Sequence, residues 1–115
     1  MLAAQIYVRD ADTIEVSGQA VRLQGVDAAE RGHPTFFPAR DWMIAFLRDR
    51  HIRCQLTGER SGDRLIGVCY ADGEDIGAAV IAAGHALDCR RYSGGRYRHL
   101  ETERARSTIR RARYC

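Results

Sequence analysis

Charged residues fall into three short clusters that could act together on a phosphate group. The first is Asp10-Ala11-Asp12-Thr13, the second runs from Arg22 to Glu30, and the third opens at Asp63-Arg64. The carboxylates of Asp12 and Asp27 are hard oxygen donors of the kind that Ca²⁺ and Mg²⁺ prefer. Arginine presents a planar, permanently charged fork that suits phosphate oxygens. A single loop acid is usually a solvated turn residue, but the three clusters in this order favour a metal-assisted phosphate site.

The second cluster arranges its chemistry around a bend. Arg22 and Asp27 are five positions apart with Gly25 between them, a spacing that can bring a guanidinium and a carboxylate to one rim of a sheet. Glu30 follows on the same loop, where its carboxylate could act as a general base towards water. No cysteine or histidine pair has zinc-finger spacing, so the candidate metal donors are oxygen atoms.

The elements that must position these residues follow from periodicity. Alternating or β-branched stretches predict strands over residues 5–9, 13–16, 20–24, 51–56 and 65–71. From Ala39 onwards, apolar residues recur at helical spacing and predict a core helix. They are Ala39, Trp42, Met43, Phe46 and Leu47. Asp75 should cap a short helix over residues 76–83, and residues 97–112 have helix-forming composition with a poor apolar stripe. Residues 25–37 predict a long functional loop. Residues 57–62 predict a turn, and residues 92–95 a short loop.

Length and composition limit the class of protein. The 115 residues predict one domain, 1–115, of α+β class, with a five-stranded OB-fold-type β-barrel and about three helices. No apolar run approaches the roughly 20 residues that span a bilayer, and Met1–Ala4 is too short for a complete signal peptide. From Cys89 to Cys115, nine arginines stand against two glutamates, so this segment carries about +7 and the remainder about −4. Such a basic segment predicts a polyanionic partner.

As a set, the three clusters resemble the signature of staphylococcal nuclease-like domains. That family typically has Asp-Gly-Asp-Thr, then Arg-Leu followed by Asp-(Ala/Thr)-Pro-Glu, and later an arginine at the head of a strand. The matching residues here are Asp10-Ala11-Asp12-Thr13, then Arg22-Leu23 with Asp27-Ala28-Ala29-Glu30, then Arg64. The resemblance extends from about Ile6 to Arg111. It implies the OB-type nuclease fold and hydrolysis of nucleic acid.

The resemblance also implies a role for each matched residue. The Ca²⁺ ligands would be Asp12, Asp27 and the carbonyl of Ala28. The catalytic residues would be Glu30 as general base, with Arg22 and Arg64 clamping the scissile phosphate. The expected protein is a monomeric, Ca²⁺-dependent phosphodiesterase of DNA and RNA that prefers single strands and leaves 3′-phosphates. The alternative is a non-catalytic nucleic-acid or protein-binding module on the same fold.

Some positions depart from the family pattern. Ala11 replaces the usual glycine and Ala29 the usual proline, so the following loop is less pre-ordered. Ser61-Gly62-Asp63 lacks the aromatic residue that many members have before the strand-opening arginine. Tyr92 matches a tyrosine that borders the nucleotide site in the family, and Arg90 stands where some members have a second tyrosine. Both are therefore expected to contact substrate.

The four cysteines favour two disulfides. Cys54 and Cys69 flank a turn and could face each other across a hairpin, and Cys89 and Cys115 bracket the basic segment. We expect bridges 54–69 and 89–115, with two other pairings and four buried thiols as the alternatives. Disulfides would place the protein in the periplasm or outside the cell, whereas free thiols would fit the cytoplasm.

Overall fold

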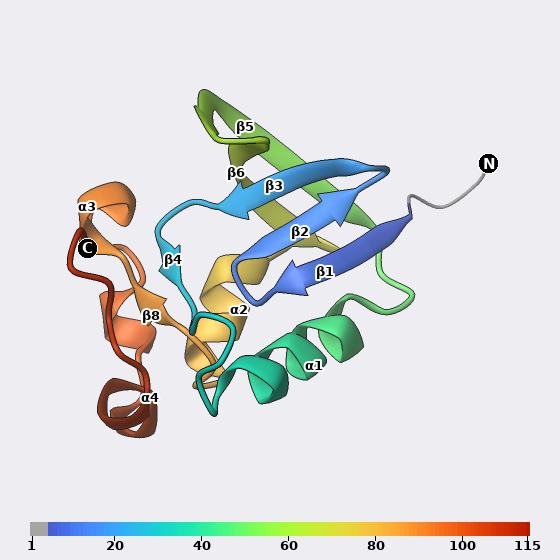
Figure 1. Cartoon of the computed structure of the whole chain (residues 1–115). Coiled ribbons are helices and arrows are strands. Elements are labelled where there is room, and N and C mark those ends of the chain that lie inside the picture. Colours follow the sequence, from blue (N-terminus) through green and yellow to red (C-terminus); the bar gives the residue numbers. More distant parts are fainter. Residues whose placement is uncertain (1–4) are drawn as a thin grey trace.

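The computed structural model describes residues 5–115, so the expectation about Met1–Ala4 lies outside the described residues. Five principal strands form one sheet in the order β1-β2-β3-β6-β5 (Figure 1). They are β1 (Ile6–Asp10), β2 (Thr13–Val16), β3 (Gln19–Leu23), β5 (Ile52–Ser61) and β6 (Arg64–Ala71). Two-residue strands complete the set: β7 (Glu74–Asp75) beside β6, and β4 (Val26–Asp27) paired with β8 (Leu87–Asp88). All five predicted strands are confirmed.

The sheet is mostly antiparallel and its order does not close. Only β3 and β6 run parallel, with Val21 opposite Leu65. β1 and β5 stand at the two ends of the order, and no ladder joins them within residues 5–115. Arg40 donates instead to the carbonyl of Val8 in β1 over 2.9 Å, so a side chain satisfies this backbone acceptor. The α+β class is therefore confirmed; the sheet of the described residues forms no closed barrel, and the OB-type barrel stays a prediction.

Within residues 5–115, four α-helices and one 3₁₀ turn pack around this sheet, compared with the three or so helices expected. Figure 1 shows α1 (Phe36–Leu47) running beneath β1, and α2 (Ile76–Ala82) behind it. The remaining elements are α3 (Arg90–Ser93), η1 (Arg98–Leu100) and α4 (Glu103–Thr108). Figure 1 shows α3 near the connection from β3 to β4, and α4 below β8. The cap of α2 is confirmed, because the Asp75 carboxylate accepts the N–H of Ala78 at 3.1 Å.

The core helix α1 begins earlier than its apolar stripe predicts. It starts at Phe36 and includes Pro38 in its first turn, where a missing N–H removes no helical hydrogen bond. Ala39, Met43 and Leu47 are buried as expected. Trp42 and Phe46 are only partly buried and stack on each other, with ring centroids 4.8 Å apart. The buried face of α1 is thus narrower than the apolar stripe.

The C-terminal segment is not the single helix expected over residues 97–112. It contains η1 and the six-residue α4, separated by Glu101 in an extended conformation. The hydroxyl of Thr102 accepts the N–H of Ala105 at 3.0 Å and so starts α4 afresh. Only Ala105 within α4 is buried, and a helix with so little packing does not extend far. Residues 92–95 differ as well, because Tyr92 and Ser93 belong to α3 rather than to a loop.

Two disulfides form, and both have the expected pairing. Cys54 and Cys69 are direct cross-strand partners in β5 and β6. Cys89 and Cys115 join the start of α3 to the last residue. The predicted turn over residues 57–62 is wrong, because β5 continues to Ser61 through a register shift and the chain reverses at residues 62–63. Among residues 5–115, no helix combines the length and apolarity that crossing a membrane requires.

Candidate functional site

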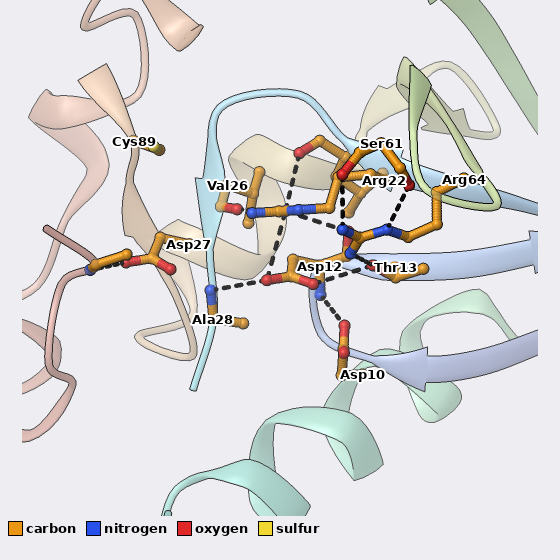
Figure 2. A network of polar contacts seen from close by, with 12 residues as sticks. Asp10, Asp12, Thr13, Arg22, Val26, Asp27, Ala28, Ser61, Arg64 and Cys89 are labelled. Carbon is orange, nitrogen blue, oxygen red and sulfur yellow. Dashed lines mark hydrogen bonds and ion pairs between the residues drawn. The ribbon is translucent and has the colours of Figure 1, made fainter. Parts of the chain in front are cut away.

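Asp12 is the centre of the polar network in Figure 2. It sits in the turn between β1 and β2, where its residue is 8% exposed. Its Oδ1 accepts the hydroxyl of Thr13 at 3.1 Å, and its Oδ2 accepts the N–H of Ala28 at 3.2 Å. Burial raises the pKa of Asp12 well above its ordinary value, the neighbouring Asp10 raises it further, and the charge of Arg22 opposes both. Ionisation of this buried carboxyl is therefore disfavoured, and a nearby cation would favour its charged form.

Arg22 lies on β3 and is held mainly by backbone oxygens. Its Nη1 donates to the carbonyl of Val26 at 2.6 Å and lies 3.4 Å from Oδ2 of Asp12. These contacts use one nitrogen of the guanidinium, so the other nitrogens take no part in them. Burial lowers the pKa of Arg22, but Asp12 and the hydroxyl of Tyr114 raise it by more. The side chain is thus a fixed cation, oriented by the same bend that carries Asp27.

Arg64, at the head of β6, approaches the same turn from the other side. Its Nη1 donates to the hydroxyl of Thr13 at 3.3 Å, and its Nη2 donates to the hydroxyl of Ser61 at 2.9 Å. Ser61 therefore orients the arginine at the position where an aromatic residue was missing from the family pattern. Because β3 and β6 are parallel neighbours, the two arginines meet around Asp12 and Thr13 (Figure 2).

A cleft of about 440 Å³ opens beside the two arginines. Its lining includes the predicted residues Arg22, Arg64 and Tyr92, together with Arg60 and Tyr114. The sequence analysis missed Arg60, which lies in what it took to be a turn, and Tyr114, which belongs to no periodic element. The available signal for Tyr114 was its position next to Cys115. The bridge from Cys115 to Cys89 brings this segment to the cleft, because Cys89 is part of the cleft lining. The lining also includes the carboxylate of Glu59. Three guanidiniums against one carboxylate, with two phenol rings, suit a ligand that is both anionic and flat.

Asp27 does not converge on Asp12. In Figure 2 it points away from Asp12, and its Oδ2 accepts the N–H of Ala112 in the C-terminal segment at 2.7 Å. Burial raises the pKa of Asp27, and the Ala112 N–H opposes that rise. Across residues 5–115, no three acidic, histidine or cysteine side chains gather closely enough to hold a metal ion. Asp12 is therefore left as a single candidate oxygen donor of the expected metal site, because the second expected carboxylate is bound to Ala112.

The other predicted residues occupy different surroundings. Ala28 is buried and donates its N–H to Asp12. Glu30 is exposed on the loop that follows, outside the cleft lining. Arg90 is exposed on α3 and is also outside that lining, although Tyr92, two positions later, is within it. The structure thus brings Arg22 and Arg64 to the Asp12–Thr13 turn and places Tyr92 with the two arginines in the cleft lining. Asp27 is bonded to Ala112, and Glu30 and Arg90 lie outside the lining.

Comparison with known proteins gives one informative similarity. The chain matches no protein-family model. It is 34% identical, over 99 residues, to the succinoglycan biosynthesis protein ExoI of Rhizobium meliloti (strain 1021). That similarity covers 76% of this chain and 52% of ExoI, so the chain spans about half the length of this relative.

Proposed function

We propose that this chain is a metal-dependent phosphodiesterase of the staphylococcal nuclease-like kind, acting on DNA and RNA. The observation that carries the proposal is the meeting of Arg22 and Arg64 at one cleft, on either side of the Asp12–Thr13 turn. Two fixed guanidiniums can bind the non-bridging oxygens of a phosphodiester and stabilise the charge that grows in a pentacoordinate transition state. Water would attack phosphorus, and the 5′-oxygen would leave.

The topology supports the OB-type assignment within this proposal. A meander of three strands is followed by a parallel β3–β6 pairing and then by β5 on the outer side of β6. An OB-fold is a five-stranded, partly open Greek-key barrel whose strands and loops bind oligonucleotides. The open edge between β1 and β5 agrees with such a partly open barrel. The cleft lies at one end of this sheet, which is where loops would receive a strand of nucleic acid.

In this proposal, Asp12 holds Ca²⁺ and Glu30 acts as the general base. The carbonyl of Ala28 and the carboxylate of Asp27 would complete the protein ligands, which requires Asp27 to release the N–H of Ala112. When bound, the ion supplies Lewis-acid polarisation of a phosphate oxygen. Within residues 5–115, Arg22 is bonded to backbone carbonyls through Nη1 alone, whereas all three guanidinium nitrogens of Arg64 donate to Ser61 or Thr13, so a phosphate would compete with some of those bonds. Disulfides persist in oxidising compartments, so we place the protein in the periplasm or outside the cell, as a monomer.

One observation favours the alternative, a non-catalytic binding module. Asp27 and Glu30, two of the acids that hydrolysis requires, do not converge on Asp12. The arginines and tyrosines of the cleft would still bind a polyanion without them. A cleavage assay separates the two functions, because only the hydrolase produces new ends.

The deciding experiment is digestion of single-stranded DNA with Ca²⁺ and with a Ca²⁺ chelator. We expect cleavage only with the ion, products that end in 3′-phosphate, and loss of cleavage in Arg64→Ala. Arg48→Ala is the matched control, because Arg48 is exposed at the end of α1 and outside the cleft lining. Binding of the DNA without Ca²⁺-dependent cleavage would establish the binding module instead.

A further inference from the structure

Two half-exposed tyrosines meet at the mouth of the cleft. Tyr92 and Tyr114 are each 49% exposed, and both line the cleft that contains Arg22 and Arg64. Their ring centroids are 6.3 Å apart, with an angle of 63° between the ring planes. Large aromatic side chains left exposed beside a cationic cleft are available to a ligand. Tyr114 comes from the C-terminal segment, far in sequence from every other aromatic residue of the site.

Tyr92 is fixed by a close approach of two segments. The N–H of Cys89 donates to the carbonyl of Gly25 at 2.8 Å. Gly25 has φ +75°, and a Cβ placed there would lie 2.5 Å from Cβ of Ser93. No side chain fits at that contact, so only glycine lets α3 rest on the bend after β3. The ring of Tyr92 is thereby held at the same bend that positions Arg22.

Tyr114 is fixed by three anchors in the residues around it. The disulfide between Cys115, which follows Tyr114, and Cys89 joins this segment to the start of α3. The N–H of Ala112 bonds to Asp27, and Nη1 of Arg111 donates to Glu101 at 2.7 Å. Ordering a mobile tyrosine only on binding would weaken affinity. The anchors therefore present the ring of Tyr114 to the cleft in advance.

The chemistry of the pair complements that of the arginines. A phosphate held by the arginines would carry its nucleoside into the space that the rings border. Base–aromatic stacking tolerates any base, because each base has a flat π-face. The tyrosine hydroxyls also leave the rings wettable in the free protein. The cleft thus has one part for the phosphate and another for the attached base.

We propose that Tyr92 and Tyr114 form a base-stacking subsite, and that the Cys89–Cys115 bridge holds Tyr114 in it. This proposal rests on the proposed function in one respect, the nucleic-acid nature of the ligand. Tyr114 was not among the residues expected to contact substrate. The position at which the family pattern has a second tyrosine is Arg90 here, and Arg90 lies outside the cleft lining. The terminal tyrosine therefore supplies the second ring from a different segment.

Binding of two probes tests the subsite independently of hydrolysis. The probes are a fluorescein-labelled twelve-residue oligothymidylate and an abasic phosphodiester of the same length, measured by anisotropy in a chelating buffer. Wild type should prefer the oligothymidylate. Tyr114→Ala should bind it roughly 5- to 150-fold more weakly, the scale of one base–aromatic stack, and should bind the abasic probe as wild type does. Tyr114→Phe should retain the preference.

Two further variants complete the design. Cys89→Ala/Cys115→Ala should lose the preference for bases, because Tyr114 is no longer held. Tyr7→Ala is the matched control, since Tyr7 is 56% exposed on β1 and outside the cleft lining. Equal weakening on both probes in Tyr114→Ala, or none on either, would overturn the subsite. A preference for bases without any cleavage would uphold the subsite and defeat only the hydrolase proposal.

Discussion

Asp27 and Ala112 are 85 positions apart in the chain, and the N–H of Ala112 donates to the carboxylate of Asp27 over 2.7 Å. The contact ties the bend that carries the candidate metal ligands to the C-terminal segment that carries Tyr114. A backbone N–H bonded to a buried carboxylate is among the stronger hydrogen bonds of a protein. The C-terminal segment is therefore part of the candidate site.

Removing this carboxylate should loosen the tail. In Asp27→Ala the N–H of Ala112 loses its acceptor, and the bond is worth about 1–3 kcal/mol. We expect faster hydrogen exchange of the Ala112 amide, measured by NMR, and earlier tryptic cleavage after Arg110 and Arg111. Asp27→Asn keeps an acceptor oxygen and should stay close to wild type. Unchanged exchange in Asp27→Ala would show that the tail is held by its other anchors alone.

Glu101 should make stability depend on pH in the acid range. Burial alone would raise its pKa, but hydrogen bonds from Arg111, the Asp88 N–H and Arg106 lower the pKa of Glu101 from 4.5 to about 2. A lowered pKa stabilises the fold above the unfolded value, here on the order of 3 kcal/mol. That contribution is complete above about pH 4.5 and is lost as the pH falls through about 2.

Urea unfolding of wild type and Glu101→Gln between pH 2 and 7 measures this contribution. The free energies of unfolding should differ most near neutral pH and converge towards pH 2. Asp12 and Asp27 have raised pKa values and act with the opposite sign, but they are common to both proteins and cancel in the difference. Glu103→Gln, an exposed neighbour on α4, should show no such trend. A pH-independent difference would remove ionised Glu101 from the explanation.

Alanine variants of Arg64 and Arg22 should differ in their effects on turnover and on stability. Arg64→Ala should lower turnover on single-stranded DNA by about 10²-fold or more, the effect of losing one preorganised donor. Its free energy of unfolding should change little, because Arg64 is partly exposed and its bonds go to neutral oxygens of Ser61 and Thr13 rather than to a buried charge. Arg22→Ala should destabilise the protein by about 3–5 kcal/mol as well, since it leaves the buried Asp12 unpaired. Wild-type turnover in both Arg64→Ala and Arg64→Lys would exclude Arg64 from the mechanism.

Glu30→Gln should lose hydrolysis and keep Ca²⁺. The side chain is exposed and is not among the contacts of Asp12, so its removal should leave the ion-binding oxygens intact. We expect turnover to fall by about 10²- to 10⁴-fold, as for a lost general base, with Ca²⁺ affinity by calorimetry unchanged. Glu74→Gln, exposed and remote on β7, serves as the control. A collapse of Ca²⁺ affinity would make Glu30 a ligand instead of the base.

Several features could be predicted from the sequence because their causes are local. The five strands follow from alternation and β-branching, and the cap of α2 follows from an aspartate just before an apolar run. The bridge between Cys54 and Cys69 follows from two cysteines on the arms of one hairpin. The candidate catalytic residues were proposed from the resemblance of three clusters to a nuclease family, and each cluster is short in sequence. In each case the relevant interactions span few residues, so the pattern carries the information.

Other features depended on contacts between distant segments. The meeting of Arg22 and Arg64 requires the parallel pairing of β3 and β6, which no local pattern specifies. The orientation of Asp27 depends on Ala112, and the place of Tyr114 depends on the bridge between Cys89 and Cys115. The apolar stripe of the C-terminal segment is too weak to determine its conformation. Ion pairs, a disulfide and a bond to a buried carboxylate determine it instead. The sequence by itself therefore determined which residues could act, whereas tertiary contacts decided which of them meet, because those contacts arise only after the chain has folded.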